Sequence, residues 1–305
     1  MRRRQLLTNL ALTAAAATSS PLLHAGAPVS EADAGDLLTT RIRDAMLGLC
    51  QASADVPAEQ LHTALAFAHA DFHACRYLSL AERLPLLLAT AHAAADGTTG
   101  SAGLLAEVYT LITRMLVKLD DQQLGWMTAD RARVLAAGAD RPLLVAEAAR
   151  QLAVLARKAG WHDQAMTIAL TAADHPALVD QPDDPRHIAE RGPLLQSAAY
   201  TAARSGDQAI YAAGDVGAAI MAARQIRPAN LPTTERRSRY YTDVARVHNL
   251  AGGRDRCLAA LLAAERHAPE ETHSRPAVRG LVQSLLISGR TSPDLRGLAR
   301  RCGIP

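Results

Sequence analysis

The fold is decided by two stretches of this chain, LARKAGWHDQAMTIALTAADHP at residues 155–176 and VARVHNLAGGRDRCLAALLAAERHAP at residues 244–269. Each stretch places a glycine between two apolar runs of helical periodicity, Gly160 in the first and Gly252 in the second. Glycine adopts a positive φ without steric cost, which suits a tight turn between helices. Small residues then recur at helical spacing, and a proline ends each phrase. The pattern predicts two helices that approach each other closely across small side chains.

Two fainter copies of the phrase lie elsewhere in the chain. Residues 108–132 carry Asp120 where the glycine stands, and residues 197–209 carry Gly206. The four turn positions are 40, 46 and 46 residues apart. This period is longer than the roughly 34 residues of a tetratricopeptide repeat, so we expect longer helices than usual. One such unit cannot bury its own apolar face, and therefore neighbouring units must stack.

These phrases predict an all-α fold, a tetratricopeptide-like α-solenoid of antiparallel helix pairs over residues 35–305. A polar C-terminal cap, SPDLRGLARRCGI, occupies residues 292–304. The small positions expected at the helix contacts include Ala165, Ala169, Ala172, Cys257, Leu261 and Ala264. An alternative stays open, because an alanine-rich helical bundle would mimic the phrase through composition alone.

Composition agrees with helices. Hydrophobic residues make up 49% of the 305 residues and aromatic residues only 3%, and alanine and leucine lose little on entering a helix. The formal net charge is +3, and it vanishes without Arg2, Arg3 and Arg4. A nucleic-acid-binding domain normally shows a basic face, so we expect no direct contact with nucleic acid.

The four cysteines are far apart, with no Cys-x-x-Cys. This spacing argues against a zinc site and a disulfide framework and favours free thiols. Proline and threonine mark helix boundaries: Pro57 suits the start of a helix, Pro85 predicts a kink or a later helix start, and Thr233 or Thr234 suits an N-cap.

The N-terminal arm, residues 1–34, has two interpretations. MRRRQLLTNLALTAAAATSS, residues 1–20, sets three arginines before a short apolar run, which is the layout of a twin-arginine export signal. The run is too short for a transmembrane helix, which needs about 20 predominantly apolar residues. The other interpretation is a linker.

Three segments resemble the C-terminal part of actinobacterial regulators of the phage-repressor (Xre) helix-turn-helix family. They are residues 231–286, residues 75–95 and residues 124–153. In those regulators a DNA-binding domain comes first, followed by an Arg-Arg-x-x-Leu linker and a tetratricopeptide-like region that senses a ligand or partner. The resemblance implies a non-enzymatic regulatory module that binds a protein or peptide and lacks its own DNA-binding domain.

The resemblance also favours the linker interpretation of residues 1–34 and a cytoplasmic location. The alternative is a tetratricopeptide scaffold exported by the twin-arginine route. One departure from the family lies at residues 202–228, where Gly206-Asp207 and Gly214-Asp215 stand too close together. A repeat is expected to have been lost there.

No catalytic constellation is evident, and we expect neither enzymatic activity, nor a cofactor, nor a metal. His62, His69 and His73 share a helical stripe but lack a His-Glu-x-x-His pattern, so they are interpreted as surface or groove residues. The glycines of residues 97–103 lack a preceding strand and a Gly-Lys-Ser/Thr, and Ser101 lacks the Gly-x-Ser-x-Gly frame.

In the tetratricopeptide pattern the first helix of each pair lines a concave groove. The positions implied to line it here are mostly basic: Arg114, Lys118, Arg150, Arg157, Lys158, Arg204, Arg239 and Arg246. The acidic residues among them are Glu107, Glu147 and Asp243. Convergent cations attract carboxylates, so we predict an anionic protein or peptide partner. The alternative is that these arginines are solvated and balanced by acids on the second helices. We expect no membrane contact, and the oligomeric state stays open.

Overall fold

The computed structural model describes residues 33–52, 56–95, 98–180, 184–205, 227–289 and 291–305. The description concerns the unit of residues 31–305. Residues 1–32 of the N-terminal arm lie outside the described residues, as do residues 206–226, which make up most of the segment where a lost repeat was expected.

Every regular element among the described residues is helical, so the all-α prediction is confirmed there. The first group comprises α2 (Ala34–Met46), α3 (Ala58–Ala74), α4 (Tyr77–Ala93), α5 (Thr99–Leu119), α6 (Gln122–Gly138), α7 (Pro142–Lys158), α8 (His162–Ala173), α9 (Pro176–Val179) and α10 (Pro185–Ser205). The second comprises the 3-10 helix η2 (Pro228–Asn230), α13 (Thr234–Leu250), α14 (Arg254–His267), α15 (Pro269–Ser274), α16 (Pro276–Ile287) and α17 (Pro293–Arg301).

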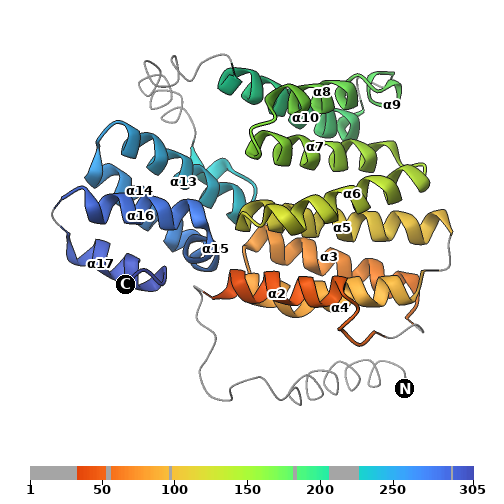
Figure 1. The fold of residues 1–305 in the computed structure, drawn as a ribbon, viewed down its shortest axis with the longest axis horizontal. Coiled ribbons are helices and arrows are strands. Elements are labelled where there is room, and N and C mark those ends of the chain that lie inside the picture. The colour runs from red at the N-terminus through yellow and green to blue at the C-terminus, as the bar shows by residue number, and fades with distance from the viewer. Residues whose placement is uncertain (1–32, 53–55, 96–97, 181–183, 206–226, 290) are drawn as a thin grey trace. The chain divides into compact units, whose positions relative to one another are not determined.

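Left-handed residues join the helices where the sequence predicted turns. Asp120, between α5 and α6, has φ 63°, Gly160, between α7 and α8, has φ 84°, and Gly252, between α13 and α14, has φ 70°. Aspartate tolerates this conformation better than most side chains do, which explains why Asp120 stands in for glycine. The helices of each pair then pack side by side, as Figure 1 shows for α5 and α6 and for α13 and α14.

Small residues occupy the contacts between paired helices. Ala165 and Ala169 of α8 are fully buried, as are Cys257, Leu261 and Ala264 of α14. Ala172 is only half-buried, and the neighbouring Ala173 takes the fully buried place. α7 also packs against α6 and α10, so adjacent pairs contact each other as well.

Two apolar cores account for most of the buried side chains. The larger core belongs to α2–α6 and encloses the bulky side chains of Phe72, Tyr77 and Tyr109. The second core lies among α13, α14, α16 and α17. Aromatic residues are so scarce in this chain that alanine and leucine supply nearly all of the remaining apolar contacts.

Local boundary signals agree with the structure in part. The Thr233 hydroxyl accepts a hydrogen bond from the Arg236 amide at 3.2 Å, which confirms Thr233 as the N-cap of α13. Pro57 is the N-cap of α3. Pro85 lies within α4, which begins at Tyr77, so the prediction of a helix start near Pro85 is wrong. Buried leucines on both sides of the proline hold the continuous helix.

Three further observations complete the fold. The four cysteines are unpaired, as predicted. Ser292 caps α17 by accepting a hydrogen bond from the Leu295 amide at 3.2 Å. None of the helices described is long and apolar enough to cross a lipid bilayer.

Candidate functional site

Titratable side chains on α3, α5, α7 and α10 interact electrostatically with one another. We call this group the charge cluster; its members are His69 and His73 of α3, Arg114 of α5, Glu147 and Arg150 of α7, and Glu190 of α10. Residues three or four apart share one helix face, which explains why the pairs on α3 and α7 each point the same way. The cluster contains two of the predicted groove residues, Arg114 and Arg150.

The Arg114 guanidinium lies over an aromatic ring. Its guanidinium carbon is 4.3 Å from the centroid of the Phe72 ring, a cation–π contact. The side chain is largely buried, and burial lowers the pKa of Arg114 below its ordinary value. Within the described part of the chain, Arg114 forms no hydrogen bond or ion pair. All five of its N–H donors therefore remain available.

Arg150 is held by a carboxylate on its own helix. Its Nε and Nη2 atoms donate to the two oxygens of Glu147, both at 2.6 Å. Gln151 donates a third hydrogen bond to Glu147, at 2.7 Å. Burial disfavours the Glu147 anion, but the hydrogen bonds from Arg150 outweigh it and hold the pKa of Glu147 below its ordinary value. This bidentate pair is satisfied internally.

Glu190 has the opposite environment. Its carboxylate is half-buried and has no hydrogen bond or ion pair with any residue that the structure describes. Burial, followed by the nearby Glu147 charge, raises the pKa of Glu190 to about 7, against the opposing effects of Arg150 and Arg114. Glu190 is therefore an acid that exchanges its proton near neutral pH.

His69 and His73 flank Arg114 from α3. Their rings are stacked with centroids 6.5 Å apart. Burial, and then the Arg114 charge, lower the pKa of His69 to about 4 and that of His73 below its ordinary value. Nδ1 of His73 is buried without a hydrogen-bond partner among the described residues. Both shifts favour the neutral form of the two rings.

Lys118, one turn after Arg114, lies at a separate junction between distant parts of the chain. Its Nζ is 2.9 Å from Glu235 of α13 and 3.1 Å from both carboxylate oxygens of Glu271 in α15. It also lies 4.8 Å from the Phe72 ring centroid. Lys118 thus forms an internal ion-pair network.

Glu271 is the centre of this Lys118 junction and is fully buried. Arg275 donates to its Oε1 at 3.1 Å, and the Cys75 thiol donates to its Oε2 at 2.7 Å. Burial, followed by the Glu271 charge, raises the pKa of the Cys75 thiol, so this cysteine stays protonated.

The other predicted groove residues are distributed over three helices. Arg157 donates to the Ser197 hydroxyl at 3.2 Å, and Lys158 donates to Asp120 at 2.5 Å and to the Val117 carbonyl at 2.8 Å. Arg239 and Arg246 lie on either side of Asp243 on α13, at 3.8 Å and 3.5 Å. The Arg204 side chain lies outside the described residues, although its backbone belongs to α10.

Acidic side chains at positions outside the predicted groove set also accompany the predicted cations. Three further acids lie among the predicted cations: Glu190, Glu235 and Glu271. Sequence reasoning missed Glu271 because α15 is a short helix 153 residues away from Lys118 in the chain. Among the predicted cations, Arg239 has a highly exposed side chain, with 66% of its surface accessible.

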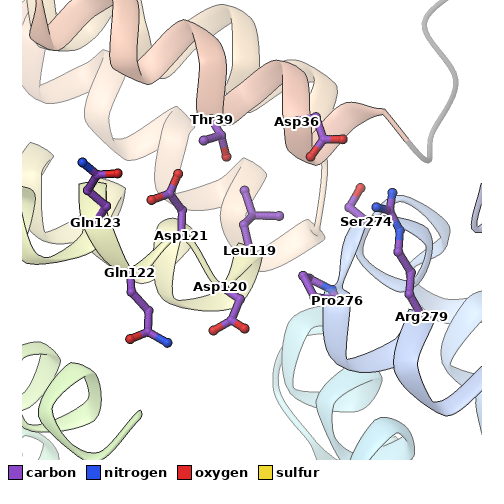
Figure 2. A pocket seen from close by; sticks show the side chains of 10 residues that line it. All are labelled: Asp36, Thr39, Leu119, Asp120, Asp121, Gln122, Gln123, Ser274, Pro276 and Arg279. Atoms are coloured by element: carbon purple, nitrogen blue, oxygen red, sulfur yellow. The ribbon is translucent and has the colours of Figure 1, made fainter. Parts of the chain in front are cut away.

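A shallow depression lies beside the Lys118 junction, on another side of α5. Figure 2 shows its lining, with Asp36 and Thr39 from α2 and Ser274, Pro276 and Arg279 from α15 and α16. The turn from α5 to α6 supplies the rest of the lining: Leu119, Asp120, Asp121, Gln122 and Gln123. Asp120 accepts a hydrogen bond from Lys158 and Asp121 accepts one from the Leu124 amide, so both carboxylates have structural roles.

The remaining sequence candidates acquire structural roles. Ser101 lies in the first turn of α5, where its amide donates to the Thr98 hydroxyl at 3.3 Å. Gly97 lies outside the described residues. Within the ranges that the structure describes, no group of three or more histidine, cysteine or acidic side chains is arranged to hold a metal ion.

Comparison with known proteins adds nothing to this geometry: no family model matches the chain, and no match was found among curated proteins or solved structures.

Proposed function

We propose that this chain is a non-enzymatic binding module, a tetratricopeptide-like solenoid that recruits an anionic protein or peptide through the first helices of its pairs. The observation that carries the proposal is the shared electrostatic environment of α3, α5, α7, α10 and α13. These five helices each supply charged or titratable side chains, and the charges on one helix shift the pKa values on the next.

The helix pairs support the solenoid arrangement. Three of them, α5–α6, α7–α8 and α13–α14, share a left-handed turn residue and buried small residues in the second helix. Contacts run from α6 to α7 and from α8 to α10, which is the stacking of neighbouring pairs that a solenoid requires in this part of the chain.

Arg239 and Arg246 are the residues best suited to meet a partner. Their side chains are 66% and 46% exposed, and both lie within ion-pair distance of Asp243. Exposed ion pairs contribute little to folding, so these arginines exchange Asp243 for a partner carboxylate at low cost.

A capture experiment from the native host tests the proposal. The double variant Arg239→Glu, Arg246→Glu is expected to lose the partners that the wild-type protein retains, because repulsion replaces attraction. The matched control is Arg133→Glu with Arg300→Glu, two exposed arginines outside the predicted set, on α6 and α17. If the first variant keeps every partner, or the control loses them equally, the proposed surface is wrong.

The regulatory role follows from the resemblance to Xre-type regulators. In this proposal the chain acts in the cytoplasm on a DNA-binding partner. The alternative is an exported tetratricopeptide scaffold. Cell fractionation with intact-mass measurement separates the two. The regulator is expected inside the cell with its N-terminal residues retained. A mature form that begins near Gly26 or Pro28 and is found outside the cell would support export.

A further inference from the structure

The short helix α15 meets helices from much earlier in the chain through polar side chains. Its last four residues, Glu271–Ser274, are all buried. The larger apolar core nevertheless contains only one described residue from beyond α10, Ala268. Hydrogen bonds and ion pairs, more than apolar contacts, therefore hold α15 against α2, α4 and α5.

α15 supplies hydrogen-bond acceptors to the N-termini of α2 and α4. In neither helix does the N-cap side chain accept a bond from the first amides, which have no carbonyl partner within the helix. The Leu78 amide of α4 instead donates to Oε2 of Glu270 at 2.8 Å. The Gly35 amide of α2 donates to the Ser274 hydroxyl at 3.2 Å. One distant segment thus satisfies an amide in the first turn of each of two helices.

Glu271 adds two further donors to this contact. Its carboxylate accepts from the Cys75 thiol at 2.7 Å and from the Lys118 ammonium at 3.1 Å. We call the four donating groups the α15 site: the Gly35 and Leu78 amides, the Cys75 thiol and the Lys118 ammonium. Because all four groups donate, the site selects carboxylate and hydroxyl acceptors.

The segment held in the α15 site has the chemistry expected of an anionic peptide. It offers two adjacent carboxylates, Glu270 and Glu271, and a hydroxyl three residues later, Ser274. We propose that the α15 site is a binding site for an acidic peptide segment and that α15 is its resident occupant. An external peptide with the same Glu-Glu-x-x-Ser pattern competes with α15 for the four donors.

Exchange is feasible because an external peptide restores the same bonds that α15 gives up. Burying an ion pair yields little net stability, while leaving one partner unpaired is costly. An incoming segment with equivalent acceptors avoids that cost. α15 has the advantage of covalent attachment, which keeps its effective concentration high. It therefore acts as an autoinhibitory segment, and external peptides bind well only where its own contacts are weakened.

The inference rests on the proposed function and deepens it, because Lys118 is one of the predicted groove residues and the ligand is an anionic peptide. The two proposals nevertheless fail separately. Partner capture is assigned to Arg239 and Arg246, and the α15 site contains neither of them. If the charge reversal of these two arginines keeps every partner while an acidic peptide binds the α15 site, only the surface on α13 is wrong.

Fluorescence anisotropy with a synthetic peptide tests the competition. The probe is residues 268–276, APEETHSRP, with fluorescein at its N-terminus and an amide at its C-terminus. The protein is the full chain, either as the wild type or as the double variant Glu270→Ala, Ser274→Ala. The double variant loses two contacts of α15, so its site is free more often. We expect it to bind the probe at least about tenfold more tightly than the wild type does.

Two controls isolate the cause. The variant Asp255→Ala, Thr291→Ala changes an exposed acid and an exposed hydroxyl outside the α15 site, so it is expected to bind the probe as the wild type does. A probe with both glutamates replaced by glutamine is expected to bind the double variant at least about tenfold more weakly, because it lacks the carboxylates.

Three results of the peptide experiment would overturn the inference. The first is equal affinity of the wild type, the double variant and the control variant for the probe. The second is a double variant that does not bind the probe at about 1 mM. The third is a glutamine probe that binds as tightly as the glutamate probe.

Thiol labelling of the wild-type protein tests the release of α15 even if the double variant fails to fold. Cys75 belongs to the α15 site, whereas Cys257 and Cys302 belong to the second apolar core, and all three are buried. Release of α15 exposes Cys75 and leaves that core intact. Iodoacetamide is therefore expected to modify Cys75 at least about tenfold faster than the other two, as measured by mass spectrometry. Equal rates would show that α15 leaves only when the whole chain unfolds, which would overturn the inference.

Discussion

Lys118 shows how one side chain connects segments far apart in the sequence. With only 11% of its side chain exposed, its ammonium lies between Glu235 and the fully buried Glu271. The pairing joins α5 to α13 and α15. Burying three charges is costly in itself, and the geometry repays the cost only while each charge keeps its partners.

Replacing Lys118 by methionine is therefore expected to destabilise the fold by about 3 kcal/mol. Glu235 then loses the ion pair with Lys118, and Glu271 keeps the ion pair with Arg275. The control is Arg133→Met, whose pair with Asp130 is exposed and should contribute less than about 1 kcal/mol. Urea unfolding followed by circular dichroism measures both. Equal stability of the two variants would show that the Lys118 junction does not form.

Glu190 gives a pH dependence with a definite sign. Its pKa rises from the ordinary value of 4.5 to about 7 in the fold, so the folded state holds the proton more tightly than the unfolded state does. The corresponding stabilisation is complete below pH 4.5 and is lost as the pH rises through about 7. We expect the free energy of unfolding of the wild type, minus that of Glu190→Gln, to fall across this window.

The subtraction is needed because His69 acts in the opposite direction. Burial lowers its pKa from 6.5 to about 4, so its contribution to stability is gained as the pH rises through that range. Unfolding measured at several pH values from 4 to 8 separates the two contributions. A wild-type minus Glu190→Gln difference that rises with pH, or stays flat, would contradict the environment described for Glu190.

The helix pair α7–α8 shows why the elements were predictable. Gly160 takes the positive φ that the turn requires, and Ala165 and Ala169 are fully buried where small residues were expected. These features depend on the backbone freedom of glycine and the small size of alanine, which can be read from the residue types alone. Pro85 shows the limit of such reasoning, because tertiary burial keeps α4 continuous through a residue that usually ends a helix.

Ala165→Leu is expected to overpack the contact around α8 and to cost roughly 1–3 kcal/mol. Gln164→Leu is the matched control, because the adjacent side chain is exposed and has room for the added leucine. Thermal unfolding should show a clear decrease in melting temperature for the first variant only. An unchanged melting temperature for Ala165→Leu would mean that the register of the repeat is wrong.

At the scale of the whole molecule, the contacts that matter most join residues far apart in the chain. The Gly35 amide donates to the Ser274 hydroxyl at 3.2 Å across 239 positions, and Cys75 reaches Glu271 across 196. No local pattern encodes such pairs, since they depend on how successive helix pairs are oriented. The sequence therefore indicated which helices would carry basic residues. It could not indicate that Glu190, Glu235 and Glu271 would lie near those basic residues.

The same limit applies to the candidate site. The tetratricopeptide pattern implied helices before the turns at Asp120 and Gly160, and the structure has Arg114 and Lys118 on α5 and Arg150 on α7. The sequence pattern alone did not distinguish these three cations from one another. The structure distinguishes them, because Lys118 and Arg150 are neutralised internally, while Arg114 keeps its donors free within the described residues.

Arginine footprinting with a captured partner tests the central claim most directly. A reagent specific for guanidinium groups labels exposed arginines, and mass spectrometry reads the labelling with and without the partner. We predict that Arg239 and Arg246 become protected on binding, while Arg133 and Arg186, outside the predicted surface, label equally in both states. Protection of Arg133 or Arg186 with unchanged labelling of Arg239 and Arg246 would contradict the claim that the first helices form the binding surface.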